Sequence, residues 1–271
     1  MSPTPSTHLK LASDVATLAA ELPRSRRRLV ATAGMAVAAV ALFAFIGSEA
    51  LVDRLLVRAF GTIPDPVFGT PLLDLTWQHL AIVAVSSALT LAVGLPLGIW
   101  VTRESGRDFR DIVSAAVDFG QVFPPIAVLA LMFPLLGISP ASAVLALFLY
   151  GLLPVVSGTV AGLEAVSPAV IDAARGMGLG RWRILFTVEL PLASPVIMAG
   201  IRTSVIVNVG TATVAAATGA GGLGLPIFTG INTSNTGNVV EGALAVSALA
   251  LLLDGTLATL TSWVTPQGAQ E

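Results

Sequence analysis

Long apolar runs with almost no charged residues constrain this chain more than any other feature. No Asp, Glu, Lys or Arg occurs from Phe119 to Leu163, and a helix needs about 20 mainly apolar residues to cross the hydrocarbon of a bilayer. Only 11% of the 271 residues are charged, against about 25% in an ordinary soluble domain. A soluble fold would lack polar surface, so the sequence predicts an all-α, polytopic membrane protein.

The apolar segments predict about six transmembrane helices. In chain order they are 29–52, about 79–101, two within 119–163 with a break near 137–140, about 194–217 and about 239–264. Residues 53–78 turn polar and contain Ile63-Pro64-Asp65-Pro66, which favours an external loop. The remaining parts are an N-terminal tail (1–28), a core membrane domain (79–264) with a polar loop at 164–191, and a C-terminal tail (265–271).

The first apolar segment has two interpretations. It follows a cluster of four arginines that includes Arg26-Arg27, as a twin-arginine signal peptide would. The apolar stretch is longer than the usual core of a signal peptide, and further spans follow. We therefore expect residues 29–52 to be an additional N-terminal transmembrane helix.

The distribution of basic residues predicts the orientation. With a cytoplasmic N-terminus, only Arg54 and Arg58 lie outside, whereas all other basic residues between 1 and 183 lie inside: Lys10, Arg24, Arg26, Arg27, Arg28, Arg103, Arg107, Arg110, Arg175, Arg181 and Arg183. Cytoplasmic loops are enriched in Lys and Arg. We expect a multi-pass protein of the cytoplasmic (inner) membrane with both termini in the cytoplasm.

The polar loop 164–191 is predicted to be structured. Ser167-Pro168 is typical of a helix start, and Gly178 of a helix stop. A second short helix would end at Pro191. Two short helices of this kind make a compact knob on the inner face, where small residues allow close approach of a partner and charges such as those of Asp172 and Arg181 set its register. An interfacial amphipathic connector is the alternative.

This loop carries a resemblance to a known family. Asp172-Ala173-Ala174, then Gly178 and finally Val188-x-Leu190-Pro191 resemble the EAA loop of binding-protein-dependent ABC importer permeases. The chain departs from the family pattern in having Asp for Glu and Val for Ile. The resemblance implies the type I ABC importer permease fold and a helix that couples to a separate ATPase subunit. It assigns that coupling to Asp172, Ala173, Ala174 and Gly178, which the charge of Arg181 would assist.

The resemblance covers about 79–254 and is most similar to the osmoprotectant branch of the family. The segments that carry it are 172–178, 189–202, Asn208-Val209-Gly210-Thr211-Ala212-Thr213, 219–224 and Phe228-Thr229-Gly230. It implies import of glycine betaine, carnitine, choline or proline. The implied partners are an ABC ATPase subunit, an extracytoplasmic substrate-binding protein, a second permease chain that is the same or related, and membrane lipid.

The glycine-rich segment 219–224 superficially resembles a nucleotide-binding loop. It lacks the following Lys and Ser/Thr, and no strand precedes it, so a tight re-entrant or external turn is the better interpretation. With no P-loop, no cysteine and two histidines, we expect a transport subunit that is not an enzyme and has no cofactor, metal or nucleic-acid partner.

Polar residues within the predicted spans are candidates for the translocation pathway. Asn208, Thr211 and Thr213 lie in an otherwise apolar segment, and Asp254 interrupts the last one. An ionisable residue in a span is a functional candidate. The alternatives are hydrogen bonds between helices for the first three, worth about 1 kcal/mol or less each. For Asp254 the alternative is a position near the cytoplasmic end of its helix, where it snorkels or pairs with a neighbouring subunit. Asp118 and Arg202 could pair across helices, and His79 is interpreted as interfacial.

Two other classes of function were weighed. An ion-coupled secondary transporter would need an internal repeat and carboxylates near the midplane, and it would leave the loop 164–191 unexplained. A membrane-embedded enzyme would need a convergent catalytic set, which the sequence does not contain. An ABC permease for another small polar solute also remains open.

Overall fold

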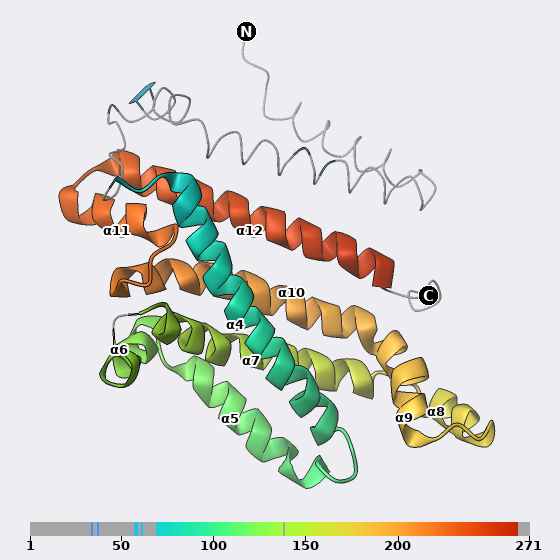
Figure 1. The fold of residues 1–271 in the computed structure, drawn as a ribbon. Helices are drawn as coiled ribbons and strands as arrows, with labels where there is room; N and C mark the ends of the chain where they lie inside the picture. Colours follow the sequence, from blue (N-terminus) through green and yellow to red (C-terminus); the bar gives the residue numbers. More distant parts are fainter. Residues whose placement is uncertain are drawn as a thin grey trace, which may run out of the picture.

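The computed structural model describes residues 69–137 and 139–264, together with Gly34, Val37, Val57, Arg58 and Gly61. Apart from the single residues named, the expected first span at 29–52 and positions 53–68 of the expected loop lie outside these residues, as does the tail 265–271. All the regular elements among the described residues are helices (Figure 1). Its elements are α4 (Leu72–Val101), η2 (Arg107–Phe109), α5 (Arg110–Val122), α6 (Pro125–Leu136), α7 (Pro140–Glu164), α8 (Pro168–Gly176), α9 (Arg181–Ile184), η3 (Leu185–Glu189), α10 (Leu190–Ala215), η4 (Ala216–Thr218), α11 (Gly224–Thr233) and α12 (Thr236–Val264).

Four helical segments in the described part are long and apolar enough to cross a membrane. They are Leu72–Val101, Pro140–Glu164, Arg181–Thr218 and Thr236–Thr261. A fifth span is possible if the pair Arg107–Val122 and Pro125–Leu136, bent by 94°, counts as one. The all-α membrane fold is confirmed, and the described residues contribute four or five of the six spans expected.

Helix α7 packs against both α4 and α10, and glycines set how closely these helices approach. At the crossing of α7 and α10, a Cβ added to Gly200 would lie 2.4 Å from the carbonyl oxygen of Pro154 and 3.1 Å from the Cα of Gly158. No larger residue fits there without moving a helix. Small residues at helix contacts are typical of membrane bundles, where close backbone packing contributes to association.

The break between α5 and α6 has a local cause. Phe123 is extended, with ψ 139°, as expected for a residue that precedes proline. Its carbonyl accepts a hydrogen bond from the hydroxyl of Tyr150, and Gln121 Nε2 donates to the Tyr150 carbonyl at 2.6 Å. The Phe123 carbonyl at the break is thereby paired with α7, and the Tyr150 carbonyl, which loses its helical donor because Pro154 has no N–H, is paired with α5, as backbone groups at membrane depth require.

Two expected element ends differ in the structure. Helix α4 begins at Leu72, seven residues before the expected start at His79. The prediction that Pro191 ends a helix was wrong, because the chain is helical from Arg181 to Thr218. A π-helical turn, η3, precedes α10, and Pro191 lies in the first turn of α10. Proline is tolerated where local π adjustments satisfy the freed backbone groups.

The glycine-rich segment forms a tight turn, as expected. Gly219, Gly221 and Gly222 have positive φ of 79°, 84° and 84°, and the short helix α11 follows. Gln78, near the start of α4, accepts a hydrogen bond from the backbone N–H of Gly222 at 3.2 Å. The turn and α11 therefore lie at the α4 start, at the end of the bundle opposite α8 and α9 (Figure 1).

Candidate functional site

The loop 164–191 folds into a knob made of α8, a turn at 177–180 and α9. Helix α8 begins with Pro168 at its first position, and the Ser167 side chain makes no capping hydrogen bond. Ile171 of α8 packs against an apolar cluster that includes Val166 and Leu185. The knob is therefore attached to the membrane helices by its own small core.

Gly178 ends α8 in a well-defined motif. It has φ +80°, its N–H donates to the Arg175 carbonyl at 2.9 Å, and the Leu179 N–H donates to the Ala174 carbonyl at 3.2 Å. This is the Schellman arrangement, which satisfies the last carbonyls of a helix and favours glycine at the left-handed position. The predicted stop at Gly178 is confirmed.

The two alanines of the motif face different surroundings. Ala173 is exposed, whereas Ala174 is only 2% exposed within this chain. Helix α8 packs on α9 and η3, so Ala174 lies on the inner side of the knob. Its small size serves packing inside the permease. The exposed members of the predicted coupling set are Asp172, Ala173, Gly178 and Arg181.

Ion pairs connect the knob, and the π-helical turn η3 that follows it, to the loop after α4. Arg181 Nη1 lies 3.2 Å from Glu104 Oε2, and Arg103 Nη2 lies 2.6 Å from Glu189 Oε2. The side chain of Glu189 is only 9% exposed. Its buried charge is therefore neutralised by Arg103, as buried charges require. These contacts bring the basic loop near Arg103 and the knob to one end of the bundle, as the predicted orientation requires.

The knob also carries an apolar surface that the sequence interpretation missed. Met177, Trp182 and Phe186 are 73%, 74% and 61% exposed. The rings of Trp182 and Phe186 stack with centroids 6.3 Å apart. Their spacing of four residues on a helix was the available signal. Exposed aromatic and Met side chains are typical of a contact surface. The knob also carries a charged pair, with Asp172 Oδ1 3.0 Å from Arg175 Nη1.

Asn208 lies in the polar interior of the bundle. It is fully buried, and its Nδ2 donates to the hydroxyls of Ser86 at 3.4 Å and Ser87 at 3.2 Å on α4. Its Oδ1 is buried and has no hydrogen-bond partner. Thr90 and Ser204 add hydroxyls along the same contact of α4, α7 and α10, bonding to carbonyls of Ser86 and Gly151 respectively. The arrangement matches the alternative of hydrogen bonding between helices.

The other pathway candidates do not converge with Asn208. Thr211 is buried, and Thr213 is half-buried and donates to the Val209 carbonyl at 3.2 Å on its own helix. Asp254 on α12 accepts two hydrogen bonds from Arg202 on α10. Arg202 is therefore paired with Asp254, and not with Asp118 as the sequence allowed.

His79 is a core residue, so its interpretation as interfacial was wrong. It is 0% exposed, and its Nε2 lies 3.2 Å from the Val209 carbonyl oxygen on α10. A Cβ added to Gly222 would lie 3.1 Å from its Nδ1. Because α4 begins at Leu72, His79 lies two turns inside the helix, where it joins α4, α10 and the glycine-rich turn.

Comparison with known proteins gives matches along most of the chain. Residues 94–265 match the family described as "Binding-protein-dependent transport system inner membrane component". The chain is 39% identical over 202 residues to the glycine betaine/carnitine/choline transport system permease protein of Bacillus subtilis (strain 168), covering 74% of this chain and 92% of that protein. It is 41% identical over 202 residues to an osmoprotectant import permease protein of Salmonella typhimurium (strain LT2), covering 73% and 93%.

Solved structures give the same result for the fold. A chain of the MetNI methionine ABC transporter in an inward-facing conformation superposes with a TM-score of 0.64 at 25% identity, covering 70% of this chain and 94% of that one. The segment matched by the family contains the last part of α4, the knob and all later helices of the described chain.

Proposed function

Because this chain belongs to the family of binding-protein-dependent transport system inner membrane components, and is thus a permease subunit of an ABC importer, we propose that it imports a small osmoprotectant. Glycine betaine, carnitine, choline and proline are the candidate solutes. One observation carries the proposal: relatives named for such solutes are 39–41% identical and cover about three-quarters of the chain. The methionine transporter is only 25% identical. Another small polar solute is the alternative.

The proposed coupling to the ATPase runs through α8. Permeases of this family are transport subunits, and a separate subunit hydrolyses ATP. The exposed Asp172, Ala173 and Arg181, with the turn at Gly178, would contact that subunit. The support is that α8 is fixed at its end by the Schellman turn and at its base by Ile171, so a force applied to it is transmitted to the membrane helices. Ala174 would act inside the knob.

The proposed pathway is lined by polar groups of α10. Asn208, Thr211 and Thr213 fall within about one and a half turns of this helix, and Asp254 is bound to its Arg202. The buried and unpartnered Oδ1 of Asn208 supports a role, because an unpaired polar atom in a membrane interior is costly. It would gain a partner when the helices move or when solute or water enters.

The remaining partners follow from the type of system. The family description implies a substrate-binding protein on the external side. A second permease chain, identical or related, would complete the pathway. We place both termini in the cytoplasm, supported by the basic residues gathered near the knob.

The test is uptake by a host strain that lacks its own betaine, carnitine, choline and proline importers. The chain is expressed with its ATPase and binding protein, and entry of each labelled solute is measured beside labelled methionine. Uptake of at least one osmoprotectant, dependent on this chain, is expected. Uptake of methionine alone, or no uptake of any osmoprotectant with all three components in the membrane fraction, would reject the proposal.

A further inference from the structure

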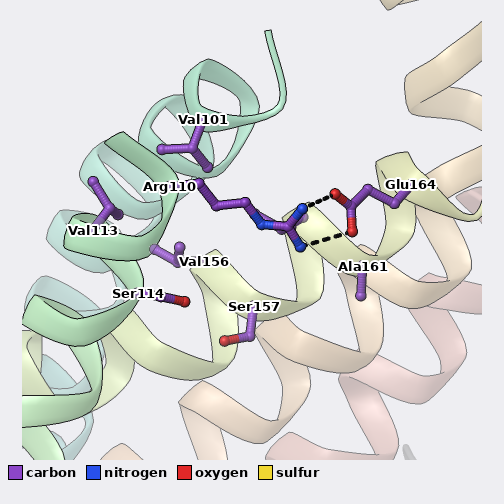
Figure 2. Close-up of a pocket in the computed structure, with 9 residues that line it drawn as sticks. Val101, Arg110, Val113, Ser114, Val156, Ser157, Ala161 and Glu164 are labelled. Atoms are coloured by element: carbon purple, nitrogen blue, oxygen red, sulfur yellow. Dashed lines mark hydrogen bonds and ion pairs between the residues drawn. The ribbon is translucent and has the colours of Figure 1, made fainter. Parts of the chain in front are cut away.

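A groove at the knob end of the bundle holds two opposite charges side by side. It lies between α5 and α7 beside the end of α4 and has a volume of about 190 Å³. Figure 2 shows Arg110 of α5 reaching across to Glu164 of α7 above the two hydroxyls of Ser114 and Ser157. Arg110 Nη1 donates to Glu164 Oε1, and Nη2 donates to Oε2 at 2.9 Å.

The lining residues of each helix lie on one face of that helix. Arg110, Val113 and Ser114 lie on one face of α5, and Ser157, Ala161 and Glu164 lie on one face of α7, because residues three or four apart share a face. The rest of the wall is apolar, formed by Val101, Val156 and Val160. Small side chains on α7 leave the space that larger residues would fill.

We propose that this groove is a binding site for a small zwitterion, which replaces the Arg110–Glu164 pair with its own two charges. The anionic group of the ligand would accept hydrogen bonds from the Arg110 guanidinium, and its cationic group would lie against the Glu164 carboxylate. The valines and Ala161 would contact the apolar part, and Ser114 and Ser157 would solvate the anionic end. The net charge of the groove is unchanged, because the Arg110–Glu164 ion pair is replaced by two ion pairs, one between each of these side chains and the ligand.

Size and accessibility support this ligand class. An apolar cavity of about 150 Å³ accommodates benzene, so about 190 Å³ suits a solute of slightly larger size. The Arg110 and Glu164 side chains are 44% and 46% exposed, so a ligand reaches both without unfolding the site. Solvent screening weakens an exposed ion pair, but this one is bidentate, so a ligand that must displace it is expected to bind with low affinity.

Two sources could supply the zwitterion: the imported solute arriving inside, which rests on the proposed function, or a zwitterionic lipid headgroup. Glu164 is the last residue of α7, and α8 begins at Pro168. Occupancy of the groove thus acts on the chain segment that leads directly to the coupling knob.

The test uses the complex of this chain with its ATPase subunit, delipidated in detergent and without the binding protein. Glycine betaine, glycerophosphoethanolamine, tetramethylammonium and acetate are titrated by calorimetry. At least one zwitterion should bind, and each singly charged probe should bind at least about tenfold more weakly, because it leaves one member of the ion pair without a partner. Binding of glycerophosphoethanolamine alone assigns the site to lipid, and binding of glycine betaine alone assigns it to solute.

Variants separate the site from general stability. Ala161→Leu fills the groove and should abolish binding with the ion pair intact, whereas Glu164→Gln should weaken it at least about tenfold. The matched control is Glu104→Gln, which removes the same charge from another exposed pair and should leave affinity unchanged. If Glu164→Gln fails to fold, the charge-swapped double variant Arg110→Glu/Glu164→Arg takes its place. It keeps an ion pair in the groove and should bind the zwitterion.

The outcomes distinguish a failure of the proposed groove site from a failure of the proposed import function. No zwitterion binding by the folded complex, or equal affinity in the Ala161→Leu variant, would overturn the inference. Loss of osmoprotectant uptake alone would refute only the proposed function, because glycerophosphoethanolamine and glycine betaine remain valid probes of the groove.

Discussion

Arg202 on α10 and Asp254 on α12 are joined by two hydrogen bonds within the membrane-spanning part of the bundle. An unpaired charge at a helix centre costs about 2.5–3.5 kcal/mol on insertion scales, and pairing removes most of that cost. The side chains are 41% and 34% exposed in the isolated chain, so solvent screening reduces what the pair itself adds.

The first prediction concerns this pair. Arg202→Leu leaves a lone carboxylate in α12 and should lower stability by about 1–3 kcal/mol, measured as a shift in the melting temperature of the purified complex. Arg202→Leu/Asp254→Leu should recover most of the loss. A double variant as unstable as the single one would mean that the pair has no such role.

The second prediction uses two neighbouring glycines. Gly178→Ala places a Cβ at φ +80° and should destabilise the turn by about 1–2 kcal/mol, with reduced retention of the ATPase subunit. Gly176→Ala is the matched control, because Gly176 is helical and open space surrounds it. It should retain the subunit as well as the parent does. Equal retention by both variants would contradict the conformational argument.

The third prediction separates the two alanines. Ala173→Trp should reduce ATPase retention and uptake while the membrane level and melting temperature stay unchanged, because Ala173 is exposed. Ala174→Leu should instead lower the melting temperature, since overpacking a buried site costs about 1–3 kcal/mol. Full uptake with Ala173→Trp would remove this surface from the coupling contact.

The fourth prediction tests the helix crossing. Gly200→Ala forces α7 and α10 apart, because the new Cβ would meet the Pro154 carbonyl at 2.4 Å. We expect a loss of about 1–3 kcal/mol and a lower membrane level. Gly210→Ala, on the same helix with no atom within 4 Å, should be neutral. A level unchanged by Gly200→Ala would refute the close-packing account.

The fifth prediction is topology. Reporter fusions after Arg107 and Arg181 should report the cytoplasm, and a fusion after Asn235 should report the outside. The reason is that the first two positions share the end of the bundle that carries the basic residues. An external signal at Arg181 would overturn the orientation and with it the coupling proposal.

The sequence was sufficient for features determined locally. Apolar length predicted the helices, and glycine and proline spacing predicted the start of α8 and its end at Gly178. Features that depend on contacts with neighbouring helices could not be predicted from the sequence. The burial of Ala174 depends on α9 and η3, and that of His79 on the Val209 carbonyl. The uninterrupted helix at Pro191 depends on a π-helical turn that residue propensities do not predict.

The helix from Arg181 to Thr218 has 38 residues and is therefore about 57 Å long at 1.5 Å per residue. One end belongs to the knob, and the other leads into the glycine-rich turn beside His79. A tilt of about 5° at the knob would move the far end by about 5 Å, by the same helix geometry. A movement of the knob would then reach the glycine-rich turn without an intermediate element, because both ends belong to one continuous helix.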